Sequence, residues 1–209
     1  MAYTRGDSTN IIVGAAALFT YELGNLTDGD LPAYVDGTSY KETLSDPVND
    51  FRNVGYTMNG LELQFQPDFG EVKVDQVLDV AKLFKQGMQV SLKTAFAEST
   101  LENLLFSLAG KDSDLSSVAG NPTLNLSAGD IGECPVERGL VAIGPGTGDC
   151  AVGSELERVY VAYRALSIEN VTVSAKRDEA TMFEVSFRLL PNDDASYGKI
   201  VDRTVPAHS

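Results

Sequence analysis

Apolar and polar side chains alternate with a period of two residues along much of this 209-residue chain. In the segment LELQFQ at 61–66, every second residue is apolar. The same pattern recurs at 71–76, 88–96, 156–167, 169–175 and 182–190. Because successive side chains of a strand point to opposite faces, each segment predicts a strand with one buried and one solvated face. The fold class that follows is mainly β, with antiparallel strands.

Further segments complete the expected strands and their limits. Pro67 and Gly70 interrupt the pattern and predict a break between the first two strands. The apolar stretch IIVGAAALF at 11–19 predicts a buried N-terminal strand, and KIVDRTV at 199–205 predicts a final strand or arm.

One segment, AFAESTLENLLFSLAG at 95–110, has the pattern of an amphipathic helix over about residues 99–109. We expect Ser99 to cap its N-terminus, with Glu102 completing a capping box, and Gly110 to cap its C-terminus. Leucines at i, i+3, i+4 and i+7 form one apolar stripe: Leu101, Leu104, Leu105 and Leu108. We assign this stripe to the core and expect the helix to cover an open face of the sheet.

The chain length fits a single domain over residues 1–209 with long loops. A polar loop is expected at about 24–60, and its aromatic residues favour a loop that orders against a partner. These candidate contact residues are Tyr34, Tyr40, Phe51 and Tyr56. A second irregular stretch, about 111–153, is expected to be a hairpin-bearing insertion with short strands at 123–127 and 138–144.

The net charge of −14 excludes several partners. Such an acidic chain repels phosphates, which argues against stable binding of nucleic acid or of an anionic membrane. The stretch 11–19 lacks a strong basic flank and is too short to span a bilayer, so we expect neither a signal peptide nor a membrane partner. A cytoplasm-like compartment is the expected site of synthesis.

No arrangement of residues predicts catalysis or metal binding. The only histidine, His208, is the penultimate residue, where an imidazole is poorly held beside a nucleophile. Cys134 and Cys150 are the only cysteines, too few with one histidine for a zinc site. Two free thiols are expected, although the two could pair if oxidised. We therefore expect no enzyme activity, no cofactor and no metal.

Other local motifs have simpler explanations. GPGTGDC at 144–150 lacks the Lys-Ser/Thr of a phosphate-binding loop and is expected to be a turn. The acid pairs Asp28/Asp30 and Asp112/Asp114 lack calcium-loop spacing and are expected to be solvated.

The order of three segments carries a resemblance to a known family. They are NVGYTMNGLELQFQPDFGEVKVDQ at 53–76, GMQVSLKTAFAESTLENLLFSLAG at 87–110 and YGKIVDR at 197–203. In this order they resemble the major tail tube proteins of long-tailed, non-contractile bacteriophages. The matching positions are Gly60, Asp75, Gln76, Ala97, Glu98, Thr100, Leu101, Glu102, Asn103 and Leu104.

The resemblance implies a β-sandwich-like or barrel-like subunit with one flanking helix and terminal arms. Such subunits form rings, typically hexamers, that stack into a hollow tube for DNA ejection. The implied partners are further copies of the chain, a tape-measure protein, tail-tip and terminator proteins, and phage DNA that passes without stable binding. The implied location is the virion tail, with host cytoplasm during assembly.

An acidic lumen would let DNA slide, because a tube that neutralised phosphates would hold the genome. Glu71 and Asp75 are the candidate lumen-facing acids, with Lys73 on the same polar face of the expected strand. Two alternatives remain open. One is the tube protein of a contractile injection or secretion system, and the other is a carbohydrate-binding β-sandwich with paired acids, against which the absence of Trp counts.

Overall fold

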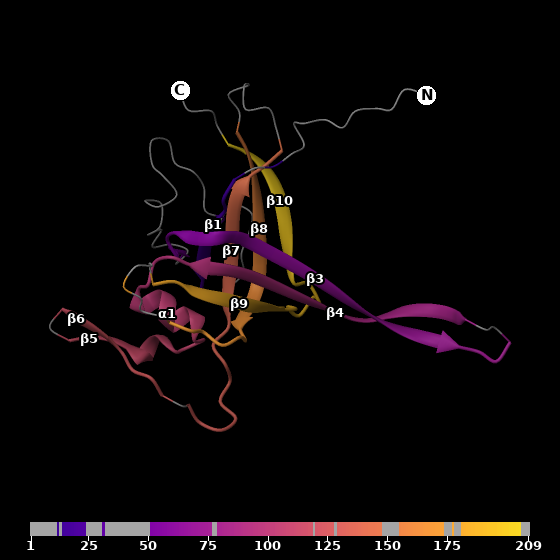
Figure 1. Cartoon of the computed structure of the whole chain (residues 1–209), viewed down its shortest axis with the longest axis horizontal. Coiled ribbons are helices and arrows are strands. Elements are labelled where there is room, and N and C mark those ends of the chain that lie inside the picture. The colour runs from indigo at the N-terminus through magenta and orange to yellow at the C-terminus, as the bar shows by residue number, and fades with distance from the viewer. Residues whose placement is uncertain are drawn as a thin grey trace.

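The computed structural model describes residues 12, 14–23, 31, 51–76, 79–118, 120–127, 129–147, 155–173, 177 and 181–205. Within them the chain is mainly antiparallel β with a single α-helix, which confirms the predicted fold class (Figure 1). The strands are β1 (Ala17–Tyr21), β2 (Arg52–Asn53), β3 (Thr57–Lys73), β4 (Val80–Phe96), β5 (Leu115–Val118), β6 (Asn121–Leu124), β7 (Arg138–Pro145), β8 (Glu155–Ser167), β9 (Phe183–Leu190) and β10 (Gly198–Val205). Helix α1 spans Leu101–Ser107, and a short 3-10 helix spans Asp112–Asp114.

The main sheet has the strand order β2-β1-β7-β8-β9-β4-β3, with β10 paired to β8 beside this path. One edge of β8 pairs with β7. Its other edge pairs with β10 over Glu155–Ala162 and then with β9 over Arg164–Ser167. The sheet therefore forks at Tyr163, and the β9-β4-β3 branch crosses the β1-β7-β8-β10 branch (Figure 1).

The main core lies between these two branches. Leu18 of β1 and Leu140 of β7 belong to the same buried cluster as the phenylalanines Phe96, Phe183 and Phe187 of β4 and β9. A second cluster covers the opposite side of β1, β7 and β8 and includes Phe19, Tyr21, Phe51, Val141 and Val159. Strands β1 and β7 are therefore buried on both faces, as their continuous apolar runs require.

Two expected boundaries change in the structure. The segment 138–144, assigned to the insertion at 111–153, forms β7 at the centre of the main sheet, so the insertion is shorter than expected. The loop expected at 24–60 contains β2 and the start of β3, and Leu31 within it is buried. The rest of 24–50 lies outside the described residues, and the N-terminal strand begins only at Ala17. The strand expected at 169–175 is absent over the described residues 169–173.

The ends of α1 differ from the predicted caps. Thr100, not Ser99, is the N-cap, and its Oγ1 accepts a hydrogen bond of 3.1 Å from the Asn103 backbone N–H. Glu102 instead pairs with Arg52, at 3.5 Å. At the other end, Ala109 has a φ of 53° and Gly110 N–H donates to Leu105 O at 3.0 Å. This is a Schellman motif with alanine in the left-handed position.

The buried side of α1 is centred on Phe106 and on a polar residue, Asn103, as well as on Leu105. The Phe106 ring lies 4.8 Å from that of Phe187 and 6.2 Å from that of Phe96. Of the leucines assigned to the core, Leu105 is buried, Leu101 and Leu104 are half-buried, and Leu108 is 46% exposed. Assigning Leu108 to the core was wrong, because the helix ends at Ser107 and Leu108 lies at its C-cap.

Asn103 joins α1 to two other segments. Its side-chain amide donates to Val54 O at 2.7 Å and to Glu98 O at 2.9 Å. The Glu98 carboxylate in turn accepts from the Tyr56 N–H at 2.9 Å. The segment before β3 is thus fastened to the end of β4 through hydrogen bonds, of which the one from Asn103 to Val54 is buried.

We expect Phe106→Ala to lower the free energy of unfolding by about 3–5 kcal/mol, because it removes a buried ring and leaves a cavity. Leu108→Ala, on the same helix but exposed, should change it by less than about 0.5 kcal/mol. Urea denaturation of both variants checks this, and equal losses would contradict the assignment of the buried face.

Tyr21 is a buried phenol of the second cluster, with its hydroxyl donating to Ala162 O at 3.2 Å. Burial, with a smaller contribution from Tyr163, raises the pKa of Tyr21 from 10.0 to about 12. Below pH 10 the phenol is neutral in both folded and unfolded chains. Between pH 10 and 12 the unfolded chain loses this proton first, so the folded state loses stability as pH rises.

Replacing Tyr21 by Phe should therefore reduce the loss of stability between pH 9 and about pH 12. The linkage amounts to at most about 2–3 kcal/mol, since each pKa unit corresponds to about 1.4 kcal/mol. Urea denaturation of the original protein and of Tyr21→Phe at the two pH values measures the difference. Parallel losses in the two proteins would show that Tyr21 does not supply it.

Candidate self-assembly surface

Strands β3 and β4, each 17 residues long, form a hairpin that extends well beyond the rest of the sheet (Figure 1). β9 pairs with β4 only over Val90–Phe96. Beyond that point the hairpin is a two-stranded ribbon, which we call the distal hairpin: residues 66–73 and 80–89. A two-stranded ribbon without further cover is marginally stable in water.

The break expected at Pro67 and Gly70 is absent, because β3 runs continuously through both residues. β3 is the outermost strand of the sheet, and an edge strand accepts proline where its missing N–H would face outward. Gly70 lies beneath the Phe84 ring, since a Cβ at this position would stand 2.6 Å from the Phe84 Cζ. The Phe84 ring, which comes from the neighbouring strand, thus occupies the space that a side chain at position 70 would fill.

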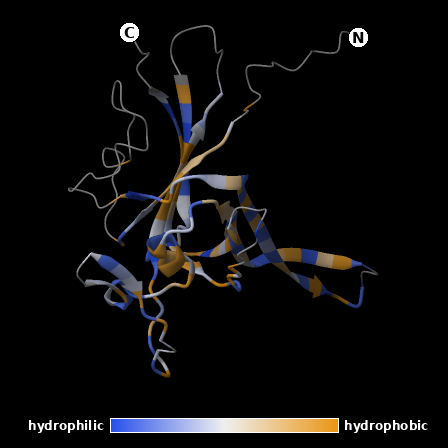
Figure 2. Ribbon diagram, turned by 60° about the vertical axis from the view of Figure 1, so that its left-hand side comes forward, coloured by the Kyte–Doolittle hydropathy of each residue, from blue (hydrophilic) through white to orange (hydrophobic). Residues whose placement is uncertain are grey.

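Apolar side chains lie on both faces of the distal hairpin. The pairing Glu71–Leu83 places Leu83 on the same face as Phe69, and the pairing Gly70–Phe84 places Phe84 on the opposite face with Val72. Their exposed fractions are 54% for Phe69, 60% for Leu83, 40% for Val72 and 44% for Phe84. Figure 2 shows these apolar stretches on the projecting ribbon. The body of the chain, as far as the structure describes it, does not cover them.

The sheet also has open edges in the described part of the chain. β3 pairs only with β4, and β10 pairs only with β8. The free edge of such a strand carries backbone N–H and C=O groups that can pair with another strand. The longest open edge therefore runs along the same hairpin that exposes apolar side chains.

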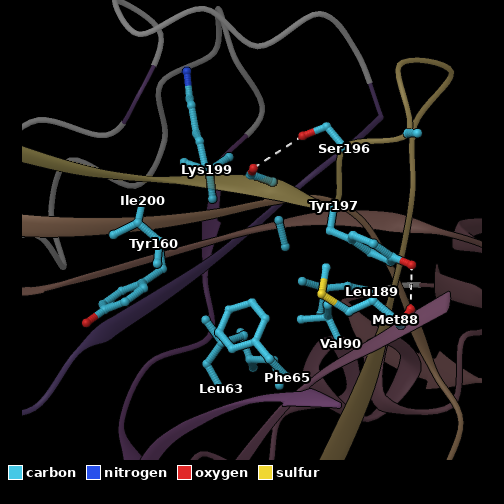
Figure 3. Close-up of a pocket in the computed structure, with 15 residues that line it drawn as sticks. Leu63, Phe65, Met88, Val90, Tyr160, Leu189, Ser196, Tyr197, Lys199 and Ile200 are labelled. Atoms are coloured by element: carbon cyan, nitrogen blue, oxygen red, sulfur yellow. Dashed lines mark hydrogen bonds between the residues drawn. The ribbon is translucent and has the colours of Figure 1, made fainter. Parts of the chain in front are cut away.

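An apolar cleft of about 340 Å³ lies at the root of the hairpin, inside the fork of the sheet (Figure 3). One wall consists of side chains from β3, β4 and β9, among them Leu63, Phe65 and Met88. The other wall consists of β8 and β10, where Tyr160 and Ile200 are paired neighbours on adjacent strands. The walls stay apart because β8 pairs with β10 and β9 in succession and the two branches diverge.

Specific contacts hold the β10 wall in place. The Tyr197 hydroxyl donates to Met88 O across the cleft (Figure 3). Arg158 makes two hydrogen bonds to Asp202, at 2.6 and 2.7 Å, and Arg203 donates to Glu157 at 2.9 Å. The hydrogen bond from Arg158 lowers the pKa of Asp202 below its ordinary value. These opposite charges face each other across the two strands and favour the observed register.

The candidate lumen acids lie near the tip of the hairpin. Glu71 is an exposed strand residue 3.6 Å from Lys73, and Asp75 lies in the turn that follows β3. The strand expected at 71–76 therefore ends at Lys73, and its last residues form the turn. Glu71 and Asp75 are close in sequence and both exposed, but they do not form one regular strand face.

The aromatic contact candidates separate into three groups. Tyr34 and Tyr40 lie outside the described residues. Phe51 is buried, 5.3 Å from the Tyr21 ring, and belongs to the second core cluster, so it does not present an exposed contact surface. Tyr56 is 63% exposed. Phe51 thus covers the side of β1 and β7 that faces away from the main core.

The described residues contain no group of three or more His, Cys, Asp or Glu side chains placed to hold a metal ion. Cys134 is an exposed free thiol, and Cys150 and His208 lie outside the described residues. Within the same ranges no helix is long and apolar enough to cross a membrane.

Comparison of the sequence with protein-family models gives no match, and comparison with curated proteins gives no match either.

Sequence reasoning missed the apolar residues of the distal hairpin as a surface. Phe69, Leu83 and Phe84 were each compatible with a buried strand face. The available signal was that apolar residues fall at both even and odd positions between Phe69 and Phe84, so no single face is polar. In a two-stranded ribbon, this pattern indicates cover from outside the domain.

We expect the distal hairpin to exchange its amide hydrogens at least ~100-fold faster than Val90–Phe96 in dilute, unassembled protein. The reason is that local opening of an unsupported ribbon costs far less free energy than global unfolding. Hydrogen exchange followed by mass spectrometry measures both segments in one sample. Equal protection in the dilute protein would contradict the description of the ribbon as unsupported.

Proposed function

We propose that the protein is a structural subunit that assembles with copies of itself into stacked rings, which form the tail tube of a long-tailed, non-contractile phage. The observation that carries the proposal is the distal hairpin, which exposes apolar side chains on both faces and an open strand edge. Exposed apolar ribbons of this kind mark interaction sites. The sequence resemblance supplies the kind of assembly, and hexameric rings are its expected form.

A contact between the distal hairpin of one copy and the body of another copy would produce an extended assembly. The distal hairpin and the body of the sheet are different surfaces of one chain, so a contact between them is head-to-tail. Such contacts generate rings where the rotation closes and filaments where it does not. A stacked tube uses both outcomes.

The charge of the chain supports the proposed role as a DNA conduit without catalysis. Each copy carries a net charge of −14, which opposes stable neutralisation of phosphates. In this proposal DNA passes through the tube without being retained, and the tape-measure, tail-tip and terminator proteins set the length and ends of the tube. The lumen is the proposed place for Asp75, because Glu71 lies on the same face of the hairpin as Phe69 and Leu83.

Purified protein at high concentration should form rings or tubes visible by negative-stain electron microscopy. The double variant Phe69→Ser/Leu83→Ser should raise the concentration needed for assembly at least ~100-fold, because two apolar side chains lose their burial. The free energy of unfolding of the dilute variant should change by less than about 1 kcal/mol, because these residues do not pack in the core.

Leu126→Ser serves as the matched control, since Leu126 is exposed but lies far from the hairpin in sequence. It should assemble at the same concentration as the original protein. A chain that remains monomeric at every concentration tested would overturn the proposed function. Assembly unaffected by Phe69→Ser/Leu83→Ser would remove the hairpin from it.

A further inference from the structure

We propose that the distal hairpin of one copy docks in the cleft of a second copy, with Phe69 and Leu83 entering the cleft and Lys85 meeting the acidic turn at its rim. The inference rests on the proposed self-assembly and adds to it the two surfaces that meet.

The size of the cleft fits this pair of side chains. An apolar cavity of about 150 Å³ accommodates one benzene-sized group. The cleft, at about 340 Å³, therefore has room for about two groups of that size. Phe69 and Leu83 are diagonal neighbours on one face of the ribbon. On the opposite face Phe84 already covers Gly70, so the Phe69–Leu83 face is the freer of the two.

The cleft is open in the single chain. Phe65 and Ile200 line it from the two branches of the sheet, and each remains about half-exposed. The chain's own Phe69 does not fill this space, because it lies four residues beyond Phe65 on the same strand, about 13 Å away at 3.3 Å per residue. The Phe69 of another copy has no such constraint.

The charges around the two surfaces are complementary. The two strands of the distal hairpin carry Lys73, Lys82 and Lys85 against Asp68 and Glu71, so they are slightly basic although the chain as a whole carries −14. Lys85 is paired with Phe69 and so shares its face of the ribbon. Beside the cleft, the turn between β9 and β10 exposes Asp193 and Asp194 next to the lining residues Ala195 and Ser196. Opposite charges at the rim fix the orientation in which the apolar residues enter.

The arrangement repeats from copy to copy. Each chain has its cleft at the root of the hairpin and its docking pair farther along the same hairpin. One copy can therefore receive a hairpin and donate its own at the same time. This head-to-tail contact is the kind that closes rings.

Cysteine cross-linking tests the contact in the full chain. In a background of Cys134→Ser and Cys150→Ser, protein carrying Leu83→Cys is mixed with protein carrying Ile200→Cys and treated with a short bismaleimide. Both positions are more than half exposed, so the folded chain tolerates them. We expect cross-linked pairs of copies in the mixture and at least ~10-fold less product when Leu126→Cys replaces Leu83→Cys.

Electron microscopy of the same mixtures separates the two proposals. Rings or tubes with no cross-link above the Leu126→Cys control would overturn the docking while leaving self-assembly in place. Samples without rings or tubes at any concentration would overturn both the proposed function and the docking.

A second pair of variants tests the cleft without cross-linking. Ile200→Asp puts a charge into the cleft and should raise the concentration needed for assembly at least ~10-fold. Ile168→Asp changes a comparably exposed isoleucine outside the cleft and should leave that concentration unchanged. Equal assembly by the two variants, with both folded by circular dichroism, would overturn the docking.

Discussion

The pairing of β8 with different strands along one edge determines the rest of the architecture. Every backbone N–H and C=O group that β8 presents on this edge can join only one ladder, so β10 and β9 occupy successive stretches of it. The sheet has to divide where one partner replaces the other, at Tyr163, whose N–H donates to Tyr197 O at 3.1 Å. One branch then folds across the other and encloses the core, while the space inside the fork becomes the cleft. Core and cleft share one cause.

The phenylalanine cluster makes this crossing stable. Phe96 lies 5.6 Å from Phe183, edge to face, and Phe187 stacks on Phe106 from the helix. Each such pair contributes about 0.5–1.5 kcal/mol beyond the area it buries. The helix is therefore part of the core and not an addition to it, and the buried amide of Asn103 fixes its position against the neighbouring backbone. The single short helix in this mainly β chain thus has a structural role. It closes one end of the core between the two branches of the sheet.

Much of the sheet could be predicted from the sequence, because period-two alternation depends only on strand geometry. The strands at 138–144 and 199–205 are found as β7 and β10 with nearly the expected limits. The prediction of a strand break at Pro67 was wrong. The cost of a proline in a strand depends on whether that strand lies at an edge, which is a property of the whole sheet. The N-cap is Thr100 and not the predicted Ser99, because both residues have a hydroxyl group suited to capping and only the backbone conformation determines which of them caps the helix. Alternation also shows which residues share a face but not what covers it, so alternation alone does not distinguish Phe69 from a core residue.

The distal hairpin joins two properties that oppose each other in a single chain. The net charge of −14 on the whole chain makes each copy repel the next, but this repulsion is screened beyond about 8 Å at physiological salt. Apolar contacts and nearby opposite charges act within that distance, and the hairpin carries both in Phe69, Leu83 and Lys85. In the proposed assembly, a subunit built in this way would stay dispersed while copies are far apart and would associate only where a specific surface fits. Replacing the apolar pair by charged residues would protect the open edge of β3, as many edge strands are protected, but it would also remove the contact proposed between copies.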